Sequence, residues 1–300
     1  MRIAILSTNK SLYSTRRLLE EIHHKGYEGV VIDHSKCFLV VEGNKPSLIY
    51  DQQEIDHIDA VIPRIGTSIS GFGCAVVRQF EMMKVFTTVK SQAIMRCRDK
   101  LRSLQILSKS GVKIPKTVMA KDSSQVEQLL ERVGGPPVII KTLEGTQGVG
   151  VVLAETKKAA KSTIEAFYGL RANFLLQEYI AEAGSADIRV FVVGNKVVAA
   201  IKRQGLEADF RANLHRGGSG TPVILSEEEE YTALAAAKAL GVKVAGVDML
   251  QSSRGPLVIE VNSSPGLQGI EEVTGVNVAN KIISYIEEQI VFDESDTVGV

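Results

Sequence analysis

The chain reads GVDMLQSSRGPLVIEVNSSPG over residues 246–266. Two apolar runs in this segment flank a stretch rich in turn-forming residues, which predicts a β-hairpin. A turn near Arg254 would place Asp248 opposite Glu260. Glu260 and Asn262 are separated by one residue, so on a strand their side chains point to the same face. One face of the hairpin would therefore carry two carboxylates and an amide oxygen.

Carboxylate and amide oxygens are hard ligands, which suit Mg²⁺ or Mn²⁺ and suit structural zinc poorly. Mg²⁺ in proteins usually shares its ligands with the phosphate oxygens of a substrate. The hairpin therefore predicts a divalent-metal site used in phosphoryl chemistry. The alternative is a strand pair whose acidic side chains simply face water, because Asp and Glu are common on protein surfaces.

The bulk composition is that of a globular protein without a large charged surface. The 300 residues are 44% hydrophobic and 23% charged, with a formal net charge of 0. The 3 cysteines, Cys37, Cys74 and Cys97, include no C-x-x-C pair, which argues against disulfides or a thiolate zinc site and suits a reducing cytosol. The first apolar run is too short for a signal peptide. We therefore expect a cytoplasmic protein that binds neither membrane nor nucleic acid directly.

Strands and helices alternate over the first third of the chain. Apolar runs predict strands over 3–6, 29–32 and 60–62, and a helix is expected over 11–25. This alternation predicts a small parallel α/β domain. Further helices are expected over 75–83, 91–110, 125–133 and 226–240, and further strands over 112–120, 138–141, 151–153, 174–180 and 187–193.

Closely spaced glycines join two of these strands in EGTQGVG, residues 144–150. Glycine lets backbone N–H groups approach phosphate oxygens without side-chain clashes. The spacing fits neither a Walker loop nor a dinucleotide-binding fingerprint. The arrangement predicts a hairpin flap over phosphates, with Gly145, Gly148 and Gly150 as its key residues. A plain hairpin turn is the alternative.

Two lysines could neutralise phosphate charge. Lys141 ends an apolar strand beside the glycine loop, and Lys100 follows a short basic run. A strand-end lysine is usually solvated, so the prediction for Lys141 depends on the neighbouring loop. The basic run before Lys100 could equally be an exposed helix face.

Polar residues at the ends of two later strands could bind a nucleotide. The backbone around Glu178 and Tyr179 could hydrogen-bond an adenine edge, and Asp187 could accept hydrogen bonds from ribose hydroxyls. Arg189 could face a transferring phosphoryl group. Each of these residues, taken alone, is more often structural.

The segment FRANLHRGG, residues 210–218, is dense in polar groups and lacks apolar periodicity. This pattern is typical of a site loop or of a mobile surface loop. Lys202 and Arg203 precede it at a strand end and could hold an acidic substrate. We expect His215 to be structural or solvated rather than a general base.

Taken in order, these motifs resemble those of the ATP-grasp ligases. The ordered set is Lys100, Lys141, the glycine loop, Gln177–Ile180, Asp187–Arg189, Phe210–Asn213, Asp248 and Glu260–Gly266. The runs Ala60–Gly66, Arg78–Glu81, Leu143–Gly148 and Gly266–Glu271 are similar to those of the RimK group, which adds L-glutamate to the C-terminus of a small-subunit ribosomal protein. Ser263 stands where alanine is usual in that group.

The resemblance covers residues 2–290 and implies a fold. That fold is α/β of the ATP-grasp (α+β) type, with an N-terminal parallel α/β domain followed by two ATP-grasp lobes. The implied boundaries are 1–95 for the pre-ATP-grasp domain, 96–175 for the central lobe with the glycine flap, 176–290 for the C-terminal lobe with the metal site, and 291–300 for a tail.

The resemblance also implies a nucleotide site between the central and C-terminal lobes. It assigns ATP binding to Lys100, Lys141, Glu178, Tyr179, Asp187, Arg211, Asn213 and the flap glycines. It assigns two Mg²⁺ or Mn²⁺ ions to Asp248, Glu260 and Asn262, and catalytic roles to Arg189 and Arg211.

The implied reaction is ATP-dependent carboxylate–amine ligation. The acceptor carboxylate takes the γ-phosphoryl group, ADP leaves, and the amine of L-glutamate displaces phosphate. The implied acceptor is the acidic C-terminal tail of a small-subunit ribosomal protein, and the implied assembly is a homo-oligomer such as a tetramer. The alternatives are ligation of glutamate or another amino acid to a small metabolite or carrier protein, a non-catalytic ATP-binding protein, and a dinucleotide-dependent oxidoreductase, which the glycine spacing disfavours.

Arginines near the implied site could recognise acidic substrates, because a guanidinium fork matches a carboxylate. Arg64 follows an N-terminal strand and could face the cleft, since ligands of α/β sheets gather at the carboxyl ends of strands. We hypothesise that Arg203 helps to select glutamate over glutamine. An uncharged side chain there would leave a buried arginine unpaired.

Overall fold

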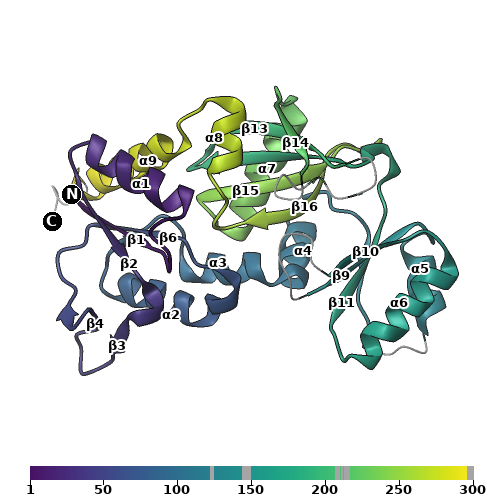
Figure 1. Cartoon of the computed structure of the whole chain (residues 1–300), viewed down its shortest axis with the longest axis horizontal. Coiled ribbons are helices and arrows are strands. Elements are labelled where there is room, and N and C mark those ends of the chain that lie inside the picture. Colours follow the sequence, from purple (N-terminus) through teal and green to yellow (C-terminus); the bar gives the residue numbers. More distant parts are fainter. Residues whose placement is uncertain (122–124, 144–149, 207–209, 211, 213–216, 296–300) are drawn as a thin grey trace.

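The computed structural model describes residues 1–121, 125–143, 150–206, 210, 212 and 217–295, with side chains described up to residue 290. Three larger sheets lie in an elongated arrangement (Figure 1). The N-terminal sheet lies at one end, the central sheet lies at the other, and the C-terminal sheet lies between them. The expected α/β architecture is confirmed.

The N-terminal sheet is parallel, as the alternation of strands and helices predicted. Its elements are β1 (Arg2–Leu6), α1 (Tyr13–His24), β2 (Glu28–Ile32), β6 (Ala60–Pro63), α2 (Ser70–Met82) and β7 (Phe86–Thr87). The strand order is β2–β1–β6–β7, and every neighbouring pair is parallel. Strands β1 and β6 are buried almost throughout, which explains their continuous apolar runs.

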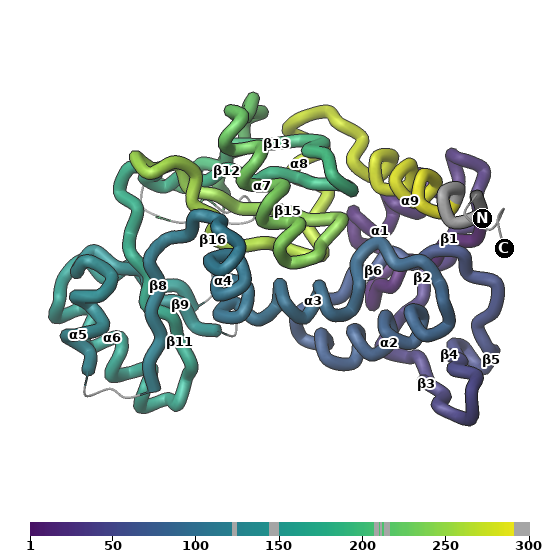
Figure 2. Tube along the Cα trace, turned by 180° about the vertical axis from the view of Figure 1, so that it is seen from behind, coloured from purple at the N-terminus to yellow at the C-terminus, as the bar shows by residue number. Residues whose placement is uncertain are grey.

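The central sheet is antiparallel and has two helices on its outer face (Figures 1 and 2). Its elements are β8 (Thr117–Val118), α5 (Val126–Arg132), β9 (Val138–Thr142), β10 (Val151–Ala154), α6 (Lys157–Gly169) and β11 (Phe174–Glu178). The strand order is β10–β9–β11–β8. Strands β9 and β10 form the predicted antiparallel hairpin around the glycine loop.

The C-terminal sheet is antiparallel, with strand order β14–β13–β12–β15–β16. Its strands are β12 (Ala186–Val193), β13 (Lys196–Gln204), β14 (Ser219–Pro222), β15 (Val244–Leu250) and β16 (Leu257–Asn262). Its helices are α7 (Glu227–Leu240), α8 (Gln268–Thr274) and α9 (Val278–Ser295). Ser226 and Glu229 form a capping box at the start of α7, so the run of glutamates there is explained by helix capping.

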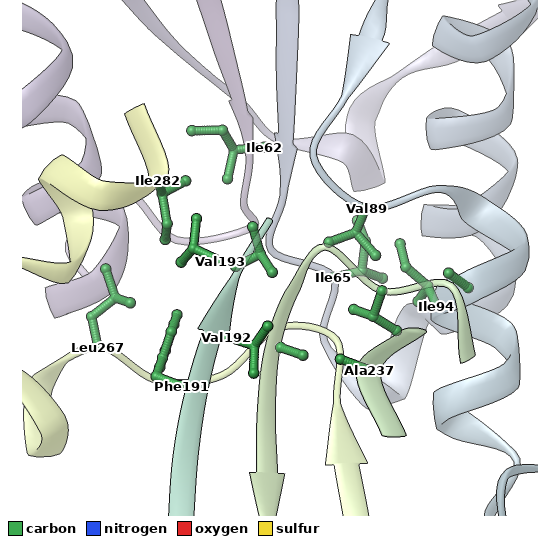
Figure 3. Close-up of a cluster of buried hydrophobic side chains, with 14 of the residues drawn as sticks. Ile62, Ile65, Val89, Ile94, Phe191, Val192, Val193, Ala237, Leu267 and Ile282 are labelled. Atoms are coloured by element: carbon green, nitrogen blue, oxygen red, sulfur yellow. The ribbon is translucent and has the colours of Figure 1, made fainter. Parts of the chain in front are cut away.

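One hydrophobic core joins the N-terminal and C-terminal sheets. Figure 3 shows residues from this cluster, among them Ile62 of β6, Val193 of β12 and Ile282 of α9. The central sheet has a core of its own, which it forms with α5 and α6. The central sheet with α5 and α6 is therefore packed independently of the larger core, which includes Leu107 of α4.

The last helix crosses back to the N-terminal sheet and packs beside α1 (Figure 2). Tyr27 donates to Glu287 at 2.9 Å, and Lys25 forms an ion pair with the same carboxylate group. Asn280 donates to Glu21 at 2.7 Å. These contacts tie the end of the chain to its beginning.

One expected helix differs from the structure, whereas the expected domain boundaries stay predictions. The helix expected over 91–110 is broken into α3 (Ser91–Arg98) and α4 (Lys100–Lys109), because Asp99 leaves helical geometry and caps α4 by accepting from the Arg102 N–H at 3.0 Å. The boundary expected between 95 and 96 falls inside α3. The boundary between 175 and 176 falls inside β11, which pairs with β9.

The remaining differences concern segments without a strong sequence signal. The tail expected from 291 begins inside α9, because no glycine or proline interrupts the helix before it ends. The strand expected over 112–120 is reduced to β8. Helix α6 and a small antiparallel sheet, formed by β3 (Phe38–Val40), β4 (Ser47–Tyr50) and β5 (Gln53–Glu54), were not anticipated. No helix in the described ranges is long and apolar enough to cross a membrane.

A buried histidine should make the stability of the protein depend on pH. His34 is 0% exposed, and neither ring nitrogen has a hydrogen-bond partner within the described part of the chain. Burial lowers its pKa. Below about pH 6.5 the unfolded chain binds a proton at this residue more readily than the folded chain does, so acidification favours unfolding. We expect the free energy of unfolding to fall less steeply with falling pH in His34→Leu than in the wild type. Parallel slopes in urea titrations of the two proteins would contradict this.

Candidate functional site

A pocket of about 370 Å³ lies between the central and C-terminal sheets. One wall comes from α4, β9 and β11, and the other comes from β12, β13, β15 and β16. Strands β9 and β11 belong to the central core, whereas α4, through Leu107, packs into the larger core together with the strands of the other wall. A pocket between such parts can open and close as they move.

Alternation along the central strands separates pocket residues from core residues. In β9, Ile140 is buried in the central core, whereas Ile139 and Lys141 line the pocket. In β11, Leu175 and Gln177 line the pocket in the same way. Because side chains alternate between the two faces of a strand, this sheet is apolar toward its helices and mixed toward the pocket.

The predicted hairpin of residues 246–266 is confirmed by its strand register. β15 and β16 pair antiparallel with Asp248 opposite Glu260. Asp248, Glu260 and Asn262 all line the pocket. Asp248 is only 3% exposed, whereas Glu260 is exposed and its carboxylate has no hydrogen-bond or ion-pair partner within the described ranges.

Two arginines share two buried aspartates at the C-terminal wall. Nε and Nη2 of Arg203 both donate at 2.6 Å to the carboxylate of Asp187. Nε and Nη2 of Arg189 donate to Asp248 at 2.7 and 2.6 Å, and Arg203 Nη2 lies 3.0 Å from the same carboxylate. Burial raises the pKa of the Asp248 carboxyl group, but the positive charges of Arg189 and Arg203 outweigh this effect and hold the pKa below its ordinary value.

This network changes the interpretation of Arg203. The hypothesis that it selects glutamate needed a guanidinium without a partner, whereas the structure pairs Arg203 with both Asp187 and Asp248. Its position between the two carboxylates suits a residue that orients them. Asp187, which was expected to accept from ribose hydroxyls, accepts from Arg203 at both oxygens.

Two lysines bring positive charge to the opposite wall. Lys141 Nζ donates to Gln177 Oε1 at 2.7 Å, and burial lowers the pKa of Lys141 to about 8 despite the opposing effect of Glu260. Lys100 Nζ donates to the backbone oxygen of Thr142 at 3.0 Å, and burial also lowers its pKa. Cations and carboxylates thus face each other across one pocket.

The low pKa of Lys141 predicts a pH-dependent affinity for nucleotide. The charged form binds phosphate, so affinity for a non-hydrolysable ATP analogue should weaken as pH rises through about 8. The decline should approach about tenfold per pH unit at higher pH. Fluorescence titrations at constant ionic strength would measure it. Arg stays charged over this range, so Lys141→Arg should lose the pH dependence, and an unchanged profile in that variant would contradict the assignment.

The strand β11 ends at a polar contact between the two walls. Glu178 Oε1 accepts from the backbone N–H of Lys116 at 2.7 Å and from Arg254 Nη2 at 2.6 Å. Arg254 lies in the turn of the β15–β16 hairpin, so this ion pair joins the C-terminal lobe to the central sheet. Tyr179, the next residue, lines the pocket.

Gly150 directly precedes β10 beside the glycine loop, and its conformation requires glycine. Its φ is +75°, and a Cβ atom built there would lie 2.1 Å from Thr142 Oγ1. The backbone N–H of Thr142 donates to Gly150 O at 2.9 Å, which closes the strand pair at this point. The expected flap is therefore anchored at a position where only glycine fits.

The structure brings most of the predicted site residues together. Ten of them line the pocket, namely Lys100, Lys141, Glu178, Tyr179, Asp187, Arg189, Arg203, Asp248, Glu260 and Asn262. Arg64 and Gly150 do not line it. Gly145, Gly148, Arg211 and Asn213 lie outside the described residues.

Sequence reasoning missed the apolar parts of the walls and two polar partners. The residues that were given no role include Ile139, Leu175, Gln177, Leu250, Arg254 and Ile259. Alternation within β9 and β11 is the signal that could have found three of them, because every second residue lies opposite a helix-covered core. The partners of Lys141 and Glu178 depend on strand pairing and had no local signal.

The donor set at the hairpin fits a divalent cation that shares its ligands with a substrate. Asp248, Glu260 and Asn262 present two carboxylates and an amide to the same pocket. Within the described ranges, no group of three or more His, Cys, Asp or Glu side chains could enclose a metal. Such an incomplete oxygen set is typical of Mg²⁺ sites completed by phosphate. Asn262 would bind the cation through Oδ1, whereas its buried Nδ2 is a donor that finds no acceptor among the described residues.

Comparisons with known proteins identify the family. The family model described as RimK-like ATP-grasp domain matches residues 97–286. The family model described as RimK PreATP-grasp domain matches residues 1–94. The chain belongs to the RimK-like ATP-grasp family. It is therefore an ATP-dependent ligase that uses a divalent metal, as is typical of the family, and the suspected resemblance is confirmed.

Relatives of the RimK-like chain cover its whole length. It is 59% identical over 288 residues to a probable alpha-L-glutamate ligase of Pseudoalteromonas translucida, covering 96% of each chain. It is 57% identical to probable alpha-L-glutamate ligase 2 of Shewanella denitrificans, covering 100% of each chain. The chain thus falls within the ATP-grasp α-L-glutamate ligases.

Solved structures share the fold of this RimK-like ligase. The ATP-grasp ligase PsnB complexed with minimal precursor, Mg and ADP aligns with a TM-score of 0.75 and 19% identity over 96% of this chain and 98% of that chain. The RimK domain protein ATP-grasp from Sphaerobacter thermophilus aligns with a TM-score of 0.70 and 20% identity, over 96% and 100%. These alignments confirm the predicted ATP-grasp architecture.

Proposed function

We propose that the protein uses ATP to join the amino group of L-glutamate to the C-terminal carboxylate of a small-subunit ribosomal protein. The observation that carries the chemistry is the pocket in which Lys100 and Lys141 face Asp248, Glu260 and Arg189. The family of full-length relatives supports glutamate as the amine substrate. The resemblance of the motifs to the RimK group supports the ribosomal acceptor.

The reaction is written in two steps. An oxygen of the acceptor carboxylate attacks the γ-phosphorus of ATP, and the bond to ADP breaks. The glutamate nitrogen then attacks the acyl carbon, inorganic phosphate leaves with the transferred oxygen, and the amine loses a proton. No side-chain nucleophile takes part, because the phosphorylated carboxylate is itself the activated group.

The residues of the chain act by binding and charge compensation. Lys100 and Lys141 would hold phosphate oxygens, while Glu178 and Tyr179 would lie at the adenine and Asp187 at the ribose. Arg189 would stabilise charge on the transferring phosphoryl group. Asp248, Glu260 and Asn262 would hold two Mg²⁺ or Mn²⁺ ions, which supply charge neutralisation when bound.

The segments outside the described residues complete the proposal. Gly145 and Gly148 would belong to the flap that excludes water from the acyl phosphate, and Arg211 and Asn213 would bind phosphate oxygens. The three-domain division, a homo-oligomeric assembly and a cytoplasmic location stay predictions.

The dependence of ADP release on both substrates tests this function. With ATP and Mg²⁺ present, release should need L-glutamate and the acceptor together. An acceptor labelled with ¹⁸O in its terminal carboxylate should pass one labelled oxygen to inorganic phosphate. Release that needs only an amino acid and a small metabolite would favour the alternative substrates, and unlabelled phosphate would reject the acyl phosphate.

A further inference from the structure

Two arginines lie at the junction of the N-terminal and C-terminal sheets without an acidic partner in the described part of the chain. Arg64 directly follows β6, and its backbone N–H donates to Leu6 O at 2.9 Å. Arg98 ends α3, and its Nη2 donates to the backbone oxygen of Ile65 at 2.5 Å. Neither guanidinium forms an ion pair with a carboxylate in the ranges that the structure describes.

The two charges are close enough to oppose each other. Burial and the neighbouring charge of Arg98 lower the pKa of Arg64 to about 10. Burial also lowers the pKa of Arg98, against the attraction of Glu260. Half-buried cations that repel one another are costly unless an anion compensates them. This position is therefore prepared for an anion that the chain itself does not supply within its described residues.

Unpartnered hydrogen-bond donors gather at the same junction. Arg98 Nε, Asn262 Nδ2 and Ser263 Oγ are buried, and none has a hydrogen-bond partner among the described residues. The next residue, Ser264, donates through Oγ to Pro63 O at 3.4 Å, so the loop after β16 meets the end of β6 here. Buried donors without partners in a native fold call for an explanation, and a bound acceptor would supply one.

The two arginines lie apart from the lysines that would hold the phosphates of the nucleotide. The break between α3 and α4 separates two cations that contact different lobes. Arg98 bonds to Ile65 of the N-terminal part, whereas Lys100 bonds to Thr142 of the central sheet. The lysines face the nucleotide pocket from the central wall, and the arginines lie on the side of the hairpin that meets the N-terminal sheet.

We propose that Arg64 and Arg98, together with the donors of Asn262 and Ser263, bind a substrate carboxylate that is not phosphorylated in the reaction. The proposal rests on the proposed function, in which both substrates carry carboxylates. Guanidinium forks match carboxylates in pairs of hydrogen bonds. The carboxylate belongs either to free L-glutamate or to the acidic terminal residue of the acceptor, and the two sources share the same chemistry.

Steady-state kinetics of ADP release separate the possibilities. L-glutamate, a synthetic peptide with a free C-terminal glutamate, and ATP are varied in turn for the wild type, Arg64→Gln and Arg98→Gln. Loss of a charge-assisted bond should raise the KM of one carboxylate substrate by about 10- to 100-fold. The KM for ATP should not change. Arg16→Gln, which removes an exposed arginine on α1, is the matched control.

The pattern of KM values decides the assignment. A raised KM for L-glutamate places the amino acid at the arginines, and a raised KM for the peptide places the acceptor there. A rise confined to ATP would make the junction a phosphate site and overturn the proposal. Wild-type constants in both variants would overturn it as well. Thermal unfolding identifies a variant that fails to fold, in which case the other variant carries the test.

A binding measurement keeps this test separate from that of the proposed function. L-glutamate and the peptide are titrated calorimetrically into the wild type and the two variants. If the wild type binds a carboxylate probe but releases no ADP, the proposed ligase reaction is rejected while the proposed binding site stands. A wild type that binds neither probe, or variants that bind as tightly as the wild type, would reject the site.

Discussion

Replacing Glu260 with alanine is expected to lower the rate of ADP release by more than about 100-fold. Glu260 presents an exposed carboxylate directly opposite Asp248, where we predict a shared metal ligand. Loss of outer-shell partners alone costs about 10- to 100-fold in metal affinity or activity, so loss of a direct ligand should cost more. The fold should be unaffected, because the side chain has no protein partner within the described ranges.

Coupled-assay rates at several Mg²⁺ concentrations test this expectation. Part of the lost activity should return at high Mg²⁺ if metal affinity is the quantity that has fallen. The matched control is Glu131→Ala, which removes an exposed glutamate on α5, away from the pocket. Near-normal ADP release by Glu260→Ala at ordinary Mg²⁺ concentrations would contradict the assignment of Glu260 as a metal ligand.

Replacing Arg203 with leucine is expected to produce the largest loss of stability, about 3–5 kcal/mol. Arg203 is 6% exposed and lies between Asp187 and Asp248, which are 8% and 3% exposed. Its removal leaves the carboxylate of Asp187 buried without its bidentate partner. The carboxylate of Asp187 would then be desolvated without a compensating partner, which destabilises the fold. Asp248, in contrast, keeps its hydrogen bonds to Arg189.

A double-mutant cycle measured by urea denaturation tests the pairing. The variant Arg203→Leu with Asp187→Leu should recover most of the lost stability, because no unpaired charge is then buried. The stability of Arg203→Lys should be intermediate, since an ammonium group cannot reproduce the bidentate hydrogen bonds of the guanidinium. If the single and double variants are equally unstable, the ion pair does not account for the loss. If Arg203→Leu is stable and only its KM for glutamate rises, the earlier hypothesis of substrate selection regains support.

The hairpin of residues 246–266 was predictable because its register is local. A short turn fixes which residues face each other, and the period of two fixes which share a face. The same reasoning placed the strands on either side of the glycine loop. The order of the motifs along the chain then identified the family and with it the pocket.

Features that depend on distant pairing were not predictable. Arg203 meets Asp187 because β12 and β13 pair in a particular register, and it meets Asp248 because β15 lies on the other side of β12. No local pattern distinguishes such an arginine from one that awaits a substrate. Arg98 was passed over because its helix was expected to continue through Asp99, although an aspartate in that position is a recognised helix start.

The return of α9 to α1 also had no sequence signal. Its apolar residues suit any helix that covers a core, and the choice of the N-terminal sheet depends on contacts such as that between Tyr27 and Glu287. This helix ties the N-terminal and C-terminal parts together, and the substrate carboxylate site proposed at Arg64 and Arg98 lies where these two parts share one core.

The intact mass of the acceptor tests the central claim most directly. A peptide with a free C-terminal carboxylate, incubated with the protein, ATP, Mg²⁺ and L-glutamate, should gain the mass of at least one glutamyl residue. The same peptide with an amidated C-terminus should gain none, because only a carboxylate can be phosphorylated. Extension of the amidated peptide, or no extension of either peptide while ADP is released, would contradict C-terminal ligation of glutamate.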